Sequence, residues 1–288
     1  MLRGLKSTLS LQLKNNNLPI LVDYNARMNL PKIFPLLLLL ICSFPFNNIQ
    51  SQQKVYSVAN AHSHNDYKQS HPFVTAYKAG FGSIEADIFF RNDKLLVAHD
   101  TSEIIQGNML QKLYLDPLLN KITANKGQVY KDASKQLILL IDIKEEATST
   151  LQKLIDILKD YPVLTNCASL KMVITGNQPA ETLLQAYPSY LYFDGNLTKT
   201  YTVEAMKKIA LFSDNFKNYS KWDGMGVLPA VDQLKIDSAI NKAHAFNKPI
   251  RFWGAPDVKP AWLQFTNMNV DYLNTDHIHK LARYIKKL

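Results

Sequence analysis

The feature that most constrains the fold is an alternation of short apolar runs with amphipathic stretches, which continues from Lys54 to the end of the chain. The run 137–143 is strongly apolar and about as long as a typical strand, whereas Thr148–Lys159 carries apolar residues at helical spacing. Alternating strands and helices predict a parallel sheet. About eight such pairs in about 235 residues predict an α/β fold, a TIM-type (βα)8 barrel in a single domain.

The periodicity also predicts where the individual elements lie. We expect strands at 55–61, 82–90, 94–98, 137–143, 170–175, 190–193, 226–228, 250–253 and 270–273, and helices at 73–79, 148–159, 179–186, 203–218, 231–246, 260–266 and 278–287. An open doubly wound sheet is the alternative. That fold usually carries a glycine-rich phosphate loop after its first strand, and this sequence has no such loop.

An apolar stretch near the N-terminus, Ile33–Phe46, is too short to cross a bilayer as a helix, which needs about 20 residues. Basic residues precede it and polar residues follow it, which is the layout of a secretory signal. We therefore expect residues 1–51 to be a signal peptide region, with Met28 as the true start, and residues 52–288 to be the barrel. The protein is then exported, to the periplasm or outside the cell. An uncleaved N-terminal anchor is the alternative.

Charge and cysteine content exclude several classes of protein. The net charge is +9, but residues 1–51 hold five basic residues and one acid, which leaves about +5 for the rest. No basic run of the kind that binds nucleic acid is present, so we expect no nucleic-acid partner and no stable protein partner. A mild attraction to phosphates or to a membrane surface is consistent with this charge.

Without residues 1–51, Cys167 is the only cysteine, so no intrachain disulfide forms.

Acidic and histidine side chains gather where the predicted strands end. In a barrel of this type, reactive side chains lie at the carboxyl ends of the strands. These ends carry, in chain order, His62 and His64, Glu85 and Asp87, His99 and Asp100, and Asp142 with Lys144. The sequence therefore predicts that these acids and histidines meet at one mouth of the barrel.

Glu85 and Asp87 point to the same side, because they lie two positions apart on a strand. Two carboxylates buried together without a partner are costly, and a bound divalent cation removes that cost. Oxygen ligands suit Mg²⁺, Mn²⁺ or Ca²⁺, and Asp142 on the next strand supplies a third oxygen. The alternative is that each acid pairs with Lys144 or with an arginine.

The histidines suit proton transfer near neutral pH. One of them can deprotonate an attacking hydroxyl or water while another protonates a leaving alkoxide. A single histidine at a strand end is more often structural, but two or three that converge on an acidic cluster favour catalysis.

These motifs together resemble the glycerophosphodiester phosphodiesterase family and, more broadly, the phosphatidylinositol-specific phospholipase C-like superfamily. The family pattern is a first-strand His, a Glu-x-Asp strand, a His-Asp about a dozen residues later and an acid-x-Lys strand. The likeness extends from about Val55 to Asp276. The segment His-Ser-His-Asn-Asp-Tyr, which stands where the family has His-Arg-Gly, resembles the branch of altered-inheritance-of-mitochondria proteins. The family motifs fall on His62, Glu85 with Asp87, His99 with Asp100, and Asp142 with Lys144.

The resemblance implies a metal-dependent phosphoric diester hydrolase that cleaves a small phosphodiester by histidine acid–base catalysis. It implies a divalent cation, Mg²⁺ or Ca²⁺, on Glu85, Asp87 and Asp142, which acts as a Lewis acid. The implied catalytic residues are His99 and either His62 or His64, with the register favouring His62. The implied substrate-binding residues are Lys144, His64, Asn65, Arg251 and Trp253.

Two other functions remain open at this point. The His-x-His spacing of His62 and His64 is that of the polymerase-and-histidinol-phosphatase group, which hydrolyses phosphomonoesters with several metals. That site needs further histidines from later strands, whereas His244 lies in a predicted helix and His277 and His279 lie past the last strand. The second alternative is a catalytically silent barrel that binds metal or a sugar or glycerol phosphate.

Overall fold

The computed structural model describes residues 54–288, which belong to one compact unit, Gln53–Leu288. The predicted signal peptide region, residues 1–51, and the predicted start at Met28 lie outside the described residues. Within residues 54–288, no helix is both long enough and apolar enough to cross a bilayer.

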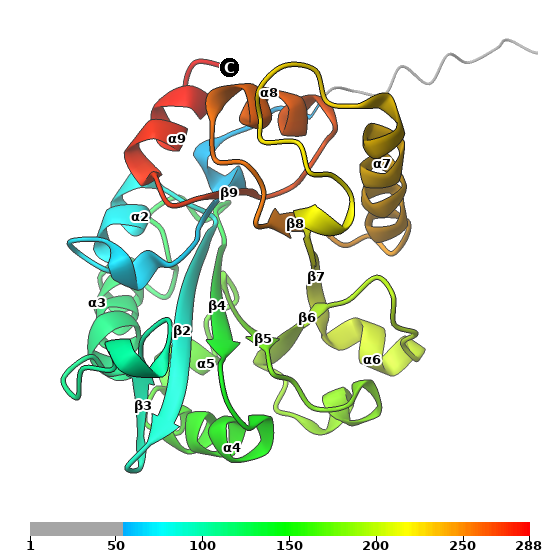
Figure 1. The fold of residues 1–288 in the computed structure, drawn as a ribbon. Coiled ribbons are helices and arrows are strands. Elements are labelled where there is room, and N and C mark those ends of the chain that lie inside the picture. Colours follow the sequence, from blue (N-terminus) through cyan, green and yellow to red (C-terminus); the bar gives the residue numbers. More distant parts are fainter. Residues whose placement is uncertain (1–53) are drawn as a thin grey trace, which may run out of the picture. The chain divides into compact units, whose positions relative to one another are not determined.

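Eight parallel strands form the central sheet, in the order β8-β7-β6-β5-β4-β2-β1-β9, with β3 paired antiparallel to β2 (Figure 1). A parallel bridge between Arg251 and Tyr272 joins the two ends of this order, so the sheet closes into a barrel. The predicted (βα)8 barrel is confirmed. The strands are β1 (Ala61–Ser63), β2 (Ser83–Arg91), β3 (Lys94–Val97), β4 (Leu137–Ile143), β5 (Leu170–Gly176), β6 (Leu191–Gly195), β7 (Ile209–Asn215), β8 (Ile250–Trp253) and β9 (Leu273–Thr275).

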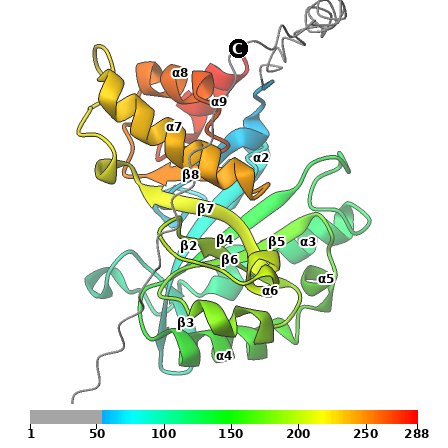
Figure 2. The same cartoon turned by 90° about the vertical axis from the view of Figure 1, so that its right-hand side faces the viewer.

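Helices surround the strands, as Figures 1 and 2 show. A short π-helical turn leads directly into α3, and several 3₁₀ turns complete the connections. The helices are α2 (Val74–Ala79), α3 (Asp116–Ala124), α4 (Ala147–Leu158), α5 (Pro162–Thr165), α6 (Val203–Lys208), α7 (Ala230–Ala245), α8 (Lys259–Asn267) and α9 (Ile278–Ile285).

The two faces of each strand pack into different cores. On β4, Leu139 and Ile141 belong to the large core that also contains apolar residues of the surrounding helices. Ile138 and Leu140, which alternate with them, belong to a small separate cluster inside the barrel. Asp142 continues the inward-facing side of the same strand. The polar site therefore lies directly above a small apolar plug in the barrel interior.

Several predicted elements differ from the structure. The helix expected at 179–186 is a 3₁₀ helix, Glu181–Ala186, and the strand expected at 270–273 is Leu273–Thr275. The first strand was expected at 55–61, but Val58–Asn60 form a 3₁₀ turn and β1 is Ala61–Ser63. The expected helix 203–218 ends at Lys208, because the buried run that follows enters the sheet as β7. A short apolar run cannot be assigned to helix or strand from periodicity alone. The strand expected at 226–228 is wrong, since these residues lie in a loop.

Candidate active site

A cavity of about 550 Å³ opens at the carboxyl ends of the strands. Nine of the ten site residues expected from the sequence line it, and His62 is the exception. This is the arrangement expected from the strand-end rule for such barrels. The nine are His64, Asn65, Glu85, Asp87, His99, Asp142, Lys144, Arg251 and Trp253.

Three carboxylates converge within this cavity. Glu85, Asp87 and Asp142 each offer one oxygen, and these oxygens lie within 4.8 Å of one another. Glu85 and Asp87 share one side of β2, and Asp87 lies beside Asp142 in the register of β2 with β4. Among residues 54–288, no other group of three or more acidic, histidine or cysteine side chains comes close enough together to hold a metal ion.

Two cations contact the same carboxylates, so the pairing considered as the alternative is also present. The Lys144 Nζ lies 2.8 Å from Oδ2 of both Asp87 and Asp142, and the Arg251 Nη1 lies 2.9 Å from Glu85 Oε2. Two cations against three carboxylates leave one negative charge uncompensated. The buried Asp87 Oδ1 has no hydrogen-bond partner among the described residues. An unsatisfied buried acceptor is costly, so these residues fit a divalent cation.

The pKa values of the two acids on β2 diverge. Burial raises the pKa of Asp87, and the neighbouring Glu85 carboxylate raises it further. Burial also acts to raise the pKa of Glu85, but the Arg251 guanidinium and the hydrogen bond with His62 outweigh burial and hold it below its usual range. Of these two acids, Asp87 is therefore the one whose charge is less compensated within the protein.

His62 is fully buried, and both of its ring nitrogens are engaged. Its Nδ1 lies 2.8 Å from Ser83 Oγ, and its Nε2 lies 2.8 Å from Glu85 Oε2 and 2.5 Å from Arg251 Nη1. Burial and the Arg251 charge lower the pKa of His62 to about 4, so the ring is neutral near pH 7. The structure thus places His62 beneath the cavity, where it contacts Glu85 and Arg251. Its expected catalytic role stays a prediction.

His64, two residues further along, lines the cavity and pairs with Asp276 just after β9. Its Nδ1 lies 2.8 Å from Asp276 Oδ1. Burial lowers the pKa of His64, but the Asp276 hydrogen bond and the Glu85 charge outweigh burial and raise it above its ordinary value. The Nε2 of His64 has no hydrogen-bond partner within residues 54–288, which leaves this atom available to a ligand.

His99 and Tyr67 meet at Asp87 on another side of the acid cluster. The half-exposed His99 has its Nδ1 3.3 Å from Asp87 Oδ2, and Tyr67 donates a hydrogen bond to the same oxygen at 2.8 Å. The hydroxyl oxygen of Tyr67 also lies 3.2 Å from His99 Nδ1. Sequence reasoning missed Tyr67, because it follows the strand by four residues and enters the site through a 3₁₀ turn, Asp66–Lys68. Asp276 was also missed, although it is an acid at a strand end.

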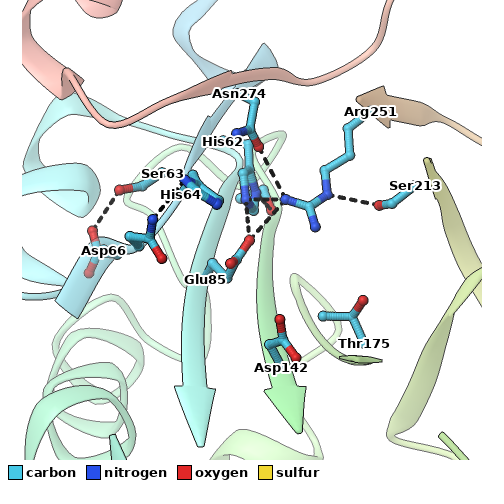
Figure 3. Close-up of polar contacts among 12 residues, drawn as sticks. His62, Ser63, His64, Asp66, Glu85, Asp142, Thr175, Ser213, Arg251 and Asn274 are labelled. Atoms are coloured by element: carbon cyan, nitrogen blue, oxygen red, sulfur yellow. Dashed lines mark hydrogen bonds and ion pairs between the residues drawn. The ribbon is translucent and has the colours of Figure 1, made fainter. Parts of the chain in front are cut away.

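Arg251 is nearly buried and is held on three sides. Its Nε donates to Ser213 Oγ at 2.8 Å, and its Nη1 contacts Glu85 and Asn274. Figure 3 shows the remaining guanidinium nitrogen pointing towards the space above Asp142. β8 therefore places a fixed positive charge opposite the acids of β2 and β4.

Gly176, at the end of β5, makes room for the carboxylate of Asp142. Its φ is +73°, a conformation that favours glycine, and a Cβ built on it would lie 2.0 Å from Asp142 Oδ1. A side chain at this position is therefore incompatible with the observed carboxylate position.

The histidines needed for a site with several metals are not gathered at the cavity. His64 and His99 line it, whereas His244 on α7 pairs with Asp271 at 2.8 Å. His277 and His279 are exposed after β9 and do not line the cavity either. The arrangement therefore favours a site with few metal ions, ligated by carboxylates.

The chain is similar to a known domain family and to several known proteins. Residues 50–192 match the AIM6-like phosphodiesterase domain. Altered inheritance of mitochondria protein 6 of Kluyveromyces lactis is 28% identical over 307 residues, which cover 81% of this chain and 73% of that protein. A homolog from Arthroderma benhamiae is 32% identical over 165 residues, 47% of this chain and 52% of that protein. A glycerophosphodiester phosphodiesterase structure from Parabacteroides distasonis aligns with a TM-score of 0.49 and 14% identity, over 79% of this chain and 97% of that one.

Proposed function

Because residues 50–192 match the AIM6-like phosphodiesterase domain, we propose that the chain is a metal-dependent phosphoric diester hydrolase that acts on a small phosphodiester. The observation that supports this most strongly is the cluster of three carboxylates, whose oxygens lie within 4.8 Å of one another. Two histidines line the same cavity, so proton donors and acceptors lie beside a candidate metal site.

Glu85, Asp87 and Asp142 would hold a divalent cation, Mg²⁺ or Ca²⁺, since their donors are all carboxylate oxygens. When bound, the cation supplies Lewis-acid polarisation of a phosphoryl oxygen. Lys144 and Arg251 add two positive charges at the cavity wall. Fixed charges of this kind stabilise the negative charge that develops on the phosphoryl group during displacement.

The proton-transfer residues in this proposal are His64 and His99. His64 has an orienting partner, Asp276, and a free Nε2 in the cavity, which is the geometry of an oriented acid–base histidine. We assign it the protonation of the leaving alkoxide. His99 then accepts the proton of the attacking water or hydroxyl. His62, which is fully buried, positions Glu85 and Arg251 in this proposal.

The test is turnover of bis-p-nitrophenyl phosphate by the purified protein, with and without EDTA. We expect EDTA to abolish turnover and added Mg²⁺ or Ca²⁺ to restore it. His64→Ala and His99→Ala are each expected to lose at least about 10²-fold in kcat, the usual contribution of general acid–base catalysis. The exposed His279, outside the cavity, provides the control variant His279→Ala. Turnover that is indifferent to EDTA, or a His64→Ala rate within a few-fold of wild type, would contradict the proposal.

We also propose that the protein is exported and that it has neither a nucleic-acid partner nor a stable protein partner. These statements stay predictions from composition and from the apolar stretch near the N-terminus.

A further inference from the structure

Helix α9 lies between α2 and α8 on the outside of the barrel (Figures 1 and 2). Its apolar residues Ile278, Leu281 and Ile285 are buried in the large core. The exposed residues of this helix and of the turn that follows it, as far as Lys287, include no acid and are His279, Lys280, Arg283, Lys286 and Lys287. A helix that is apolar on one side and basic on the other is typical of a surface that faces a membrane or an acidic partner.

Further basic side chains line the grooves on both sides of α9. The groove towards α2 and α3 is lined by five lysines, which are Lys78, Lys121, Lys131, Lys135 and Lys286. The groove towards α8 is lined by Lys259, Lys280, Arg283 and Lys287. A third depression shares Lys78 and Lys286 with the first groove and Arg283 with the second. These nine residues therefore form one continuous basic surface, the α9 surface.

The charge of the α9 surface is not balanced within the protein. None of its nine basic side chains forms an ion pair with another residue in 54–288. Two acids lie among them, and both are engaged elsewhere, since Asp132 accepts from Ser134 and Asp257 accepts from Trp262 and Thr275. The terminal carboxylate of Leu288 is a further negative charge in the first groove. The excess of about +5 that the sequence carries after residue 51 is therefore gathered on this one surface.

The kind of cation indicates a partner that is bound by charge alone. Eight of the nine residues are lysines, which act as point charges and lack the planar fork with which arginine binds a phosphate in fixed geometry. Single-stranded nucleic acids are usually bound through exposed aromatic rings on which bases stack. In the described chain, no aromatic side chain that lines these grooves is fully exposed, and Tyr77 and Tyr130 stack on each other.

The chain that precedes the barrel joins it at the α9 surface. Tyr56 and Val58 line the same groove as Lys78. Seven residues, 47–53, separate the described chain from the apolar stretch Ile33–Phe46 and can span at most about 25 Å. An apolar stretch of this length enters a bilayer as a signal or lies at its interface. For as long as it is attached, it therefore brings the α9 surface within reach of the lipid headgroups.

We propose that the α9 surface binds the anionic headgroups of a membrane and so holds the barrel at the lipid surface. Each lysine or arginine close to an anionic membrane strengthens binding about fivefold, and salt screens this attraction. The inference concerns the outer face of the barrel and does not depend on the phosphodiesterase function proposed above.

Sedimentation of the full chain with phospholipid vesicles tests this proposal. Binding to vesicles of phosphatidylcholine alone measures what the apolar stretch contributes, so the preference for anionic vesicles isolates the effect of charge. With about one-third phosphatidylglycerol in the vesicles, we expect binding at least about tenfold tighter than to phosphatidylcholine alone. This preference should disappear in about 0.5 M NaCl.

Charge-neutralising variants assign the binding to this surface. We expect binding to anionic vesicles to fall at least about tenfold in the triple variant Lys280→Gln, Arg283→Gln and Lys286→Gln. The control removes the same charge from exposed lysines that line none of these grooves, through Lys94→Gln, Lys207→Gln and Lys217→Gln, and should stay within about threefold of the wild type. Should the first variant not fold, the opposite side of the groove provides a second one, Lys78→Gln, Lys121→Gln and Lys131→Gln, with the same expected loss.

Three results would overturn the proposal. The first is equal binding of the wild type to anionic and neutral vesicles. The second is an equal loss in the control variant, since net charge and not this surface would then be responsible. The third is tighter binding to duplex DNA than to anionic vesicles at the same phosphate concentration, lost in the α9 variant, because the partner would then be a nucleic acid.

Discussion

Replacing Gly176 with alanine should displace a candidate metal ligand without touching it chemically. The new Cβ would lie 2.0 Å from Asp142 Oδ1. Non-bonded atoms of this kind settle at about 3.5 Å, so the carboxylate oxygen or the β5 backbone has to move by roughly 1.5 Å. Misplacement by about 1 Å at an active site can cost about 10²-fold in rate. We expect Gly176→Ala to weaken Mg²⁺ binding at least about tenfold and to lower kcat by about 10²-fold.

The same substitution also strains the backbone, and a control is needed to separate the two effects. Gly176 has a φ of +73°, a region that costs other residues about 1–2 kcal/mol. Gly127 has a φ of +92° but nothing within 4 Å of its added Cβ. Gly127→Ala therefore carries the backbone strain without the collision. Gly127→Ala should lose about 1–2 kcal/mol in unfolding free energy. Gly176→Ala should lose more, because its Cβ would also lie 2.6 Å from the backbone oxygen of Ile143, and only Gly176→Ala should lose metal affinity.

Calorimetric Mg²⁺ titration and urea unfolding of the three proteins provide the measurement. If Gly176→Ala binds Mg²⁺ like the wild type, then Asp142 is not a ligand or the loop adapts at no cost, and the reasoning is refuted. Equal loss of metal affinity in Gly127→Ala would refute it too, because the effect would then come from strain alone.

Two further variants test other parts of the site and its support. Tyr67→Phe removes the hydroxyl that donates to Asp87. We expect kcat/KM to fall about tenfold or more, which corresponds to the loss of a hydrogen bond to a charged group. Tyr56→Phe is the control and should not share this loss, because the Tyr56 hydroxyl donates to the backbone of Val270. Asp66 provides the second test, because burial raises its pKa to about 6. Between about pH 4 and 6 the folded state therefore binds more protons than the unfolded chain. The stability that the protonated carboxyl contributes is then lost as the pH rises through 6. Measured by urea unfolding, the unfolding free energy of the wild type should fall by on the order of 2–3 kcal/mol across that pH window relative to that of Asp66→Asn. A difference between the two proteins that does not change with pH would contradict the raised pKa of Asp66.

The strand-end rule accounts for most of the site that could be predicted from sequence. Glu85, Asp87 and Asp142 were found because alternation on a strand places them on one side, and because neighbouring parallel strands end at the same edge. Arg251 was expected from the family resemblance, and the short apolar run around it could be read as a strand. These inferences need only the period of a strand and the order of the elements.

The choice between His62 and His64 depended on a boundary that the sequence does not define. With the strand expected at 55–61, His62 stands just past its end and faces the cavity. In the structure, the Val58–Asn60 turn delays the strand to Ala61–Ser63, so His62 lies within it and is buried. His64 then takes the place at the mouth. An error of a few residues at one end, which is usual for such boundaries, moves a side chain from the cavity to the layer beneath it.

Asp194 and Asp276 could not be assigned for a different reason. Each is an ordinary acid after a short apolar run, and its environment comes from residues far away in the chain. Asp276 becomes a partner of His64 only through the pairing of β9 with β1, and Asp194 follows a register shift in the β6–β7 pairing and lines the cavity. Contacts of this kind depend on tertiary structure, to which local periodicity is blind.

The pairing of β1 with β9 also has a consequence for how the protein is made. A ribosome delivers His64, Glu85, Asp87 and Asp142 before the bridge at Tyr272 and the carboxylate of Asp276. Until then the sheet has an unpaired edge strand, and the barrel around the acids is incomplete. The closed barrel and the pair of His64 with Asp276 therefore form only after β9 has been made, and until then the unpaired strands of the nascent chain are exposed to chaperones that shield such edges.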